Sequence, residues 1–109
     1  DEIRRKNSYK IAIPLKEEKP APFLTTCDEI AMVHVKDGQI KKVERITPSE
    51  QGPIRPKVFV NLGADLVMTK DMKEKAKYVF YKNKVGVVLD IPEATPEELV
   101  EKFIKGELK

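Results

Sequence analysis

Alternating and clustered apolar residues predict three strands in the first half of the chain. YKIAIPL (9–15) is apolar and rich in strand formers, as an interior strand is. EIAMVHVK (29–36) and QIKKVERI (39–46) flank Asp37-Gly38, a pair that favours a tight antiparallel hairpin. We therefore expect a buried first strand and a hairpin made of the second and third strands.

We expect a long irregular stretch between the first and second strands and a first helix after the third strand. KEEKPAPFLTTC (16–27) contains two prolines and has no periodicity, which indicates a loop. Ile54, Val58 and Leu62 then recur at i, i+4 and i+8, and Gly63 is placed to end that helix.

The second half of the chain predicts two more strands and two more helices. DLVMT (65–69) is the fourth strand. Asp71 with Glu74 predicts an N-cap and a capping box for a helix that ends near Asn83. VGVVLDI (85–91) is the fifth strand, and TPEE (95–98) opens the last helix with an N-cap threonine, a proline and a capping box.

This order of elements predicts the topology of the sheet. Right-handed crossovers place strands four and five parallel to strand one, whereas the tight turn makes strand two antiparallel to strand three. We expect a three-layer α/β domain with a mixed five-stranded sheet of order 3-2-1-4-5, an antiparallel second strand and helices on both faces. Residues 1–7 should form a polar tail and residues 8–109 the single domain.

Composition agrees with one small domain and excludes several classes of protein. The chain has 109 residues, of which 40% are hydrophobic, enough for one core. No apolar run approaches the ~20 residues of a membrane span, and DEIRRKNS (1–8) lacks a signal-peptide core, so we interpret the protein as cytoplasmic. The single Cys27 excludes an internal disulfide and a CxxC metal site.

Several segments together resemble the dinitrogenase iron-molybdenum cofactor biosynthesis family, which consists of small domains of ribonuclease H-like topology. They are YKIAIPL, DEIAMVHVKDGQIKKVE, LGADLVMT and TPEELVEKFIKGEL, and the resemblance runs from Tyr9 to Leu108. It implies binding and delivery of an iron-sulfur or iron-molybdenum cluster precursor, exchanged with a donor or acceptor protein, and not catalysis. Where family members often have HFGRA and a glycine-rich corner, this chain has FLTTC (23–27) and KDMK (70–73).

The candidate site lies where the carboxyl ends of strands one, four and five meet the start of strand two. Open α/β sheets bind ligands at such a crevice edge. Cys27 should lie there, and its thiolate is the type of ligand that iron-sulfur clusters prefer. The alternative is that Cys27 is a small packing residue. The same edge should also carry Pro14, Thr25, Thr26, Lys70 and Asp71.

Two of the polar candidates receive a structural interpretation. An N-cap Asp71 would occupy the free N–H groups of its helix and so leave little for an anion, while Lys70 would remain an available cation. The only histidine, His34, is about 23 Å from Cys27 along the strand at ~3.3 Å per residue, too far for a shared site. We interpret it as a structural or surface histidine, with a metal ligand between subunits as the alternative.

Nucleic-acid and nuclease functions are not expected. Basic and acidic residues number 21 and 18, which leaves a net charge of only +3. A basic stripe on the middle helix is typical of a solvated helix face, although nucleic acid could use it; its members are Lys73, Lys77, Tyr81 and Lys84. The strand carboxylates are scattered and should not converge on metal ions; they are Glu29, Glu44, Asp65 and Asp90.

A protein interaction module that keeps the fold without the ligand is the alternative function. The substituted FLTTC and KDMK segments motivate it. The edge strand QIKKVERI (39–46) also has an alternation broken at Lys41-Lys42, which is typical of a charged edge that resists uncontrolled pairing.

Overall fold

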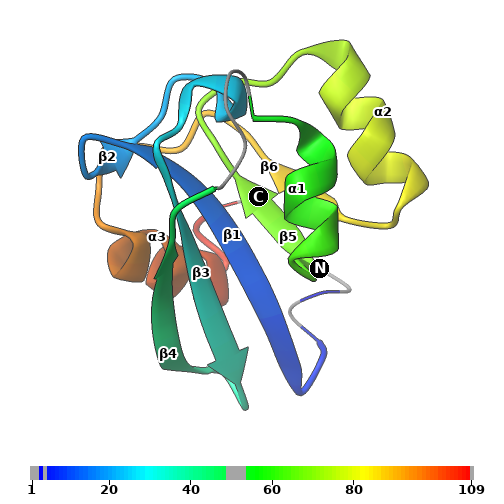
Figure 1. Ribbon diagram of the computed structural model, residues 1–109. Helices are drawn as coiled ribbons and strands as arrows, with labels where there is room; N and C mark the ends of the chain where they lie inside the picture. Colours follow the sequence, from blue (N-terminus) through cyan, green and yellow to red (C-terminus); the bar gives the residue numbers. More distant parts are fainter. Residues whose placement is uncertain (1–2, 4, 49–53, 109) are drawn as a thin grey trace.

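A mixed sheet forms the middle layer of the protein, with helices packed on both of its faces (Figure 1). The computed structural model describes residues 3, 5–48 and 54–108. In chain order the described elements are β1 (Ser8–Lys16), β2 (Lys19–Pro20), the 3-10 turn η1 (Leu24–Thr26), β3 (Glu29–Lys36), β4 (Gln39–Ile46), α1 (Pro56–Asn61), β5 (Leu66–Met68), α2 (Glu74–Lys82), β6 (Gly86–Val88) and α3 (Pro96–Ile104).

The strand order confirms the predicted topology. The sheet runs β4-β3-β1-β5-β6, which is the expected order 3-2-1-4-5. β3 is antiparallel to both β1 and β4, whereas β5 is parallel to β1 and β6. The short strand β2 adds to this path by pairing with the end of β1, so the described residues form six strands rather than five.

The stretch 16–27 is more regular than the expected loop. Leu15 and Lys16 at the end of β1 pair with β2, and η1 follows a few residues later. Glu17 and Glu18 close this tight hairpin with φ angles of 52° and 69°. Turns of this kind normally contain glycine or asparagine, so the two glutamates left no signal in the sequence.

The predicted hairpin between β3 and β4 is confirmed, and so is its irregular edge. Asp37 and Gly38 both have positive φ angles, 52° and 74°, as a two-residue hairpin turn requires. Opposite β3, the register passes from Lys42 directly to Ile40, so Lys41 is the extra residue of a β-bulge. The bulge accounts for the broken alternation of polar and apolar residues in β4.

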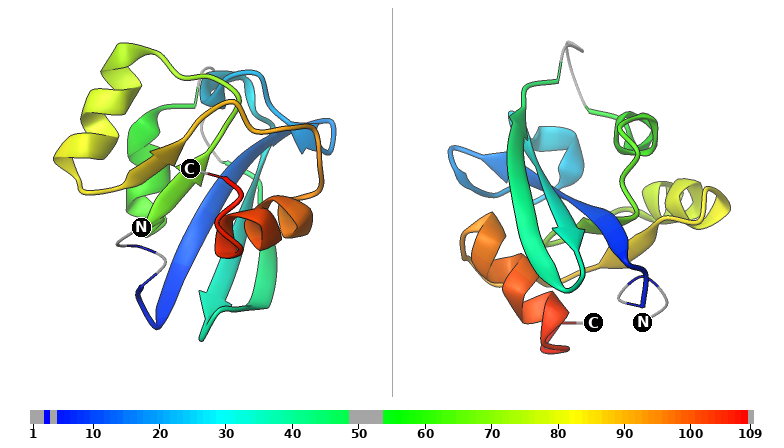
Figure 2. Two further views of the ribbon diagram at one scale, coloured as in Figure 1. Left: turned by 180° about the vertical axis from the view of Figure 1, so that it is seen from behind. Right: turned by 90° about the horizontal axis from the view of Figure 1, so that it is seen from below.

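Each face of the sheet carries its own part of the core. Figure 2 (right) shows α3 on one side of the sheet and α1 with α2 on the other. The core residues under α3 include Tyr9, Ile11, Ile13, Val33, Leu66, Leu99, Val100 and Phe103. Those under α1 and α2 include Leu24, Cys27, Ile30, Ile54, Phe59, Met72, Ala76 and Phe80. Two buried apolar faces are the reason why β1 and β3 are apolar almost throughout.

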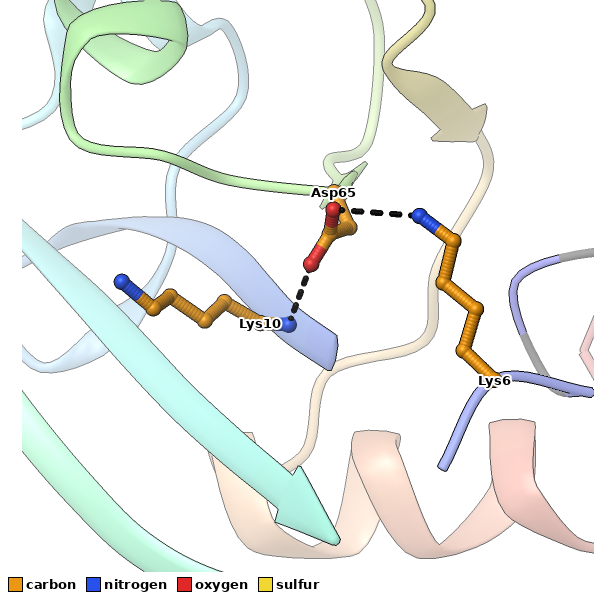
Figure 3. Close-up of polar contacts among 3 residues, drawn as sticks. All are labelled: Lys6, Lys10 and Asp65. Carbon is orange, nitrogen blue, oxygen red and sulfur yellow. Dashed lines mark hydrogen bonds and ion pairs between the residues drawn. The ribbon is translucent and has the colours of Figure 1, made fainter. Parts of the chain in front are cut away.

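One carboxylate fixes β1 against the start of β5. Asp65 Oδ2 accepts the backbone N–H of Lys10 at 2.9 Å (Figure 3). The Asp65 N–H in turn donates to the Lys10 carbonyl at 2.9 Å. Asp65 Oδ1 also lies 3.5 Å from Lys6 Nζ, so a residue of the predicted tail contacts the domain. Asp65 therefore lies at the edge opposite the crevice, where it aligns β1 with β5.

The helix boundaries agree with the predictions in part. Thr95 caps α3 through the predicted capping box with Glu98. Gly63 follows α1 with a φ of 82°, as predicted for a helix end. The inward residue of α1 is Phe59, however, whereas Val58 is only partly buried.

The predicted N-cap at Asp71 is wrong. α2 begins at Glu74, with Lys73 as its N-cap residue and no side-chain cap. Asp71 instead forms a parallel backbone bridge with Phe23, and its Oδ1 accepts the N–H of Met72 at 2.8 Å. Pairing with a distant segment holds the chain extended at this corner, so the helix cannot start there.

Candidate functional site

Four segments meet at the crevice edge, at the top of Figure 1. They are the turn from β1 into β2, the stretch 21–27 with η1, the corner 69–73 between β5 and α2, and the loop 89–95 between β6 and α3. The Phe23–Asp71 bridge joins the second segment to the third. The fold therefore brings the two segments predicted to carry the site into direct contact.

The two candidate threonines are exposed on η1. Thr26 Oγ1 donates to the carbonyl of Phe23 at 2.9 Å, a hydrogen bond that closes the turn. The Thr25 carbonyl accepts the N–H of Ile54 at 3.2 Å, which ties η1 to the approach to α1. Thr25 also borders a hollow beside α2.

Cys27 follows η1 directly and is 7% exposed. It packs in the core cluster under α1 and α2, together with Leu24 and Ile30. Burial, with a smaller contribution from the charge of Asp28, raises the pKa of the Cys27 thiol to about 11. The sulfur is thus at the predicted edge, but it is directed into the core and protonated at neutral pH.

Lys70 and Asp71 project from the corner between β5 and α2. Lys70 Nζ lies 3.6 Å from Glu93 Oε1, so this cation is paired across to the loop that precedes α3. Asp71 is exposed, and its carboxylate accepts the backbone N–H of the next residue, Met72. Because neither Asp71 nor the N-cap residue Lys73 caps α2, no described side chain caps the first N–H groups of that helix.

Pro14 and Thr69 complete the edge from inside the sheet. Pro14 is buried in β1 opposite Ile30, and its carbonyl accepts the N–H of Ala21 at 2.9 Å. Thr69 is fully buried, and its Oγ1 lies 3.4 Å from the Asp71 carbonyl. Sequence reasoning did not select Thr69, although a hydroxyl directly after a buried strand at the crevice edge was a usable signal.

The remaining titratable candidates are each engaged separately. His34 Nε2 lies 2.6 Å from Glu44 Oε1 on the surface of the β3–β4 hairpin. A hydrogen bond to His34, followed by the charge of Lys42, lowers the pKa of Glu44. Glu29 pairs with Arg45 at 3.0 Å. Within residues 3, 5–48 and 54–108, no three His, Cys, Asp or Glu side chains are grouped to hold a metal ion.

The predicted basic stripe is a dispersed feature of α2. Lys77 pairs with Glu74 at 3.3 Å, and Tyr81 is 81% exposed. Lys84 lies beyond the helix end with a φ of 60°.

In the described part of the chain, no helix is both long and apolar enough to cross a membrane.

Known proteins match this chain over most of its length. The sequence model of the family described as dinitrogenase iron-molybdenum cofactor matches residues 7–106. An uncharacterised protein of Methanocaldococcus jannaschii is 23% identical, over 92% of this chain and 89% of its own.

Two solved structures have the same fold. The crystal structure of the protein PH0822 superposes with a TM-score of 0.80 at 22% identity and covers 92% of each chain. The apo form of the orange protein of Desulfovibrio gigas superposes with a TM-score of 0.71 at 16% identity, over 93% of this chain and 91% of its own.

Proposed function

The chain belongs to the dinitrogenase iron-molybdenum cofactor family, and on this premise we propose that it is a non-enzymatic carrier of a metal cluster or cluster precursor. The match to the family over residues 7–106 is the observation that carries the proposal. The cargo would dock at the crevice edge and be exchanged with a donor or acceptor protein.

Three features of that edge support the proposal. Cys27 supplies the only thiol of the chain. The start of α2 has no side-chain cap, and N–H groups at a helix start attract anions such as thiolate- or sulfide-bearing clusters. Lys70, 36% exposed at its side chain, lies at the same corner and would contribute its positive charge to the cargo by exchanging its pairing with Glu93.

The donor set limits how the cargo would be held. Iron-sulfur clusters are commonly ligated by four cysteines, whereas this chain has one. A single chain therefore contributes one thiolate, and the remaining ligands come with the cargo or from the exchange partner. Since Cys27 has a pKa of about 11, loading must displace its proton and turn its side chain outward, so loading should improve as pH rises.

Anaerobic reconstitution with iron and sulfide, with and without molybdate, tests the proposal. The expected result is visible charge-transfer absorption that stays with the protein after desalting and is lost in Cys27→Ala. Cys27→Ser is the matched control, because it keeps the size but replaces the soft sulfur by a hard oxygen. A wild-type protein without absorption would sink cluster binding, and an unchanged spectrum in Cys27→Ala would remove Cys27 from the site.

The second candidate function is a protein interaction module without a metal ligand. The absence of a three-donor group among the described residues favours it, together with the buried thiol. Thermal melting with iron or molybdate separates the two. A ligand at ~100 times its dissociation constant stabilises a folded protein by ~2.7 kcal/mol, so a clear rise in melting temperature supports the carrier and argues against the module.

A further inference from the structure

A groove runs between α1 and α2 on the face of the sheet away from α3. It consists of two adjoining hollows of about 550 Å³ and about 200 Å³, which share Pro56 and Val79 as a common border. The larger hollow lies between the start of α1 and the second half of α2, and the smaller lies between η1 and the first half of α2. Figures 1 and 2 show the two helices next to each other on this face. We call the two hollows together the α1–α2 groove.

The rim of the α1–α2 groove is basic. Its cationic lining residues are Arg55, Lys57, Lys73, Lys75 and Lys82. None of the described residues lining either hollow is Asp or Glu, and none of these five cations forms an ion pair within the described part of the chain. Glu74, the acidic residue in the first turn of α2, is paired with Lys77 instead. Uncompensated positive charge of this kind attracts an acidic partner.

The floor of the α1–α2 groove is apolar and carries aromatic side chains. Phe23 is 37% exposed and Met72 is buried in the smaller hollow, and Val79 lies between the hollows. Tyr78 is 61% exposed in the larger hollow, with Lys82 Nζ 5.9 Å from its ring centre. Exposed aromatics beside a fixed apolar floor are typical of the anchor points of protein interfaces.

We propose that the α1–α2 groove binds an acidic segment of a partner protein, with one apolar side chain in the smaller hollow and carboxylates on the basic rim. At about 200 Å³ the smaller hollow lies below the usual range for a small-molecule site, ~300–1,000 Å³, and suits a single anchoring side chain. The larger, basic hollow receives the acidic residues that flank the anchor. This inference does not rest on cluster binding.

A protein segment fits this groove better than nucleic acid or a second copy of the chain. Nucleic acid binds through many phosphate contacts along a continuous basic track, whereas the smaller hollow of this groove is lined mainly by apolar residues. A second copy would have to present its acidic α3, which carries Glu97, Glu98 and Glu101. That contact joins unlike surfaces, so it would build rings or filaments rather than a two-fold symmetric dimer.

Fluorescence anisotropy with a short labelled peptide, in which glutamates flank one central phenylalanine, tests the inference at ~0.15 M salt. The wild-type protein should bind this peptide, and binding should weaken about tenfold or more in Lys75→Glu combined with Lys82→Glu. The matched control is Lys36→Glu with Lys41→Glu, which makes the same charge change on the exposed β3–β4 hairpin and should leave binding unchanged.

A second pair of variants tests the apolar anchor. Phe23→Ser should weaken binding, whereas Tyr81→Ser should not, because Tyr81 is exposed on α2 but lines neither hollow. Replacing the central phenylalanine of the peptide by serine should have the same effect as Phe23→Ser. If an arginine-rich peptide bound as tightly as the acidic peptide, the inference would be overturned. The same holds if Lys75→Glu with Lys82→Glu and Lys36→Glu with Lys41→Glu weakened peptide binding equally.

Two further measurements exclude the other occupants. Tighter binding of single-stranded DNA than of the acidic peptide, lost in the same α2 variant, would reassign the groove to nucleic acid. Concentration-dependent assembly in sedimentation velocity, abolished by that variant, would reassign it to a second copy. Cys27→Ala should bind the peptide normally, so failure of cluster binding and failure of this inference are distinguishable.

Discussion

Asp65 and Lys10 hold each other through two hydrogen bonds, one from each backbone N–H. The Lys10 N–H donates to Asp65 Oδ2 at 2.9 Å (Figure 3). The Asp65 N–H donates to the Lys10 carbonyl, also at 2.9 Å. The pair lies one position before the parallel register of Ile11 with Leu66. It therefore sets the alignment of β1 with β5, on which the whole crevice edge depends.

Replacing Asp65 by alanine should destabilise the protein by about 2 kcal/mol, because the part-buried Lys10 N–H loses a charged acceptor. Urea unfolding measures the change. Asp65→Asn keeps an acceptor oxygen and should cost less, and Glu107→Ala on the exposed C-terminal segment should be neutral. Equal stability of Asp65→Ala and wild type would show that the carboxylate does not fix the strand.

The buried thiol of Cys27 should react slowly. With a pKa of about 11 instead of the ordinary 9.0, its thiolate fraction at pH 8 falls roughly 100-fold. Alkylation by iodoacetamide should therefore be slow in the folded protein and fast in urea. A folded-state rate close to that of a free thiol would mean that Cys27 is accessible and ionised, contrary to its position in the core.

Removing His34 should raise the pKa of Glu44. The hydrogen bond from His34 is the largest cause of the lowered pKa and the charge of Lys42 the next. In NMR titration, His34→Ala should therefore shift the Glu44 pKa upward by more than Lys42→Ala does. A carboxyl with a lowered pKa stabilises the folded state above its ordinary pKa, and this contribution is lost as pH falls through the folded-state value. An unchanged Glu44 pKa in His34→Ala would refute the pairing.

Removing the N-cap side chain of α3 should lower the stability of the protein measurably, although Thr95 is exposed. Thr95→Ala removes the acceptor for the Glu98 N–H at 3.2 Å and should cost about 1 kcal/mol in thermal or urea unfolding. The backbone and side chain of Thr95 are also the main causes that lower the pKa of Glu98. In the wild type, the stability that the lowered pKa of Glu98 provides is lost as the pH falls through the folded-state pKa. Stability should therefore depend less on pH in this range in Thr95→Ala than in the wild type. Thr47→Ala, at an exposed position outside the helices, is the control.

Local chemistry determined most of the fold. The Asp37-Gly38 turn, the capping box at Thr95 and the helix end at Gly63 each depend on a few neighbouring residues, and all three were predicted. The strand order followed as well, because right-handed crossovers and a tight hairpin leave few ways to arrange five strands. The same order placed FLTTC and the corner after β5 at one edge.

Only the tertiary structure decided the details of that edge. Asp71 has the sequence pattern of an N-cap, but its backbone pairs with Phe23, almost fifty positions earlier, and this long-range contact moved the start of α2 to Glu74. Packing likewise directed Cys27 into the core and turned Phe59 inward in α1. The α1–α2 groove arises where two helices and η1 meet, and such surfaces depend on how elements pack, which residue spacing within one element does not encode.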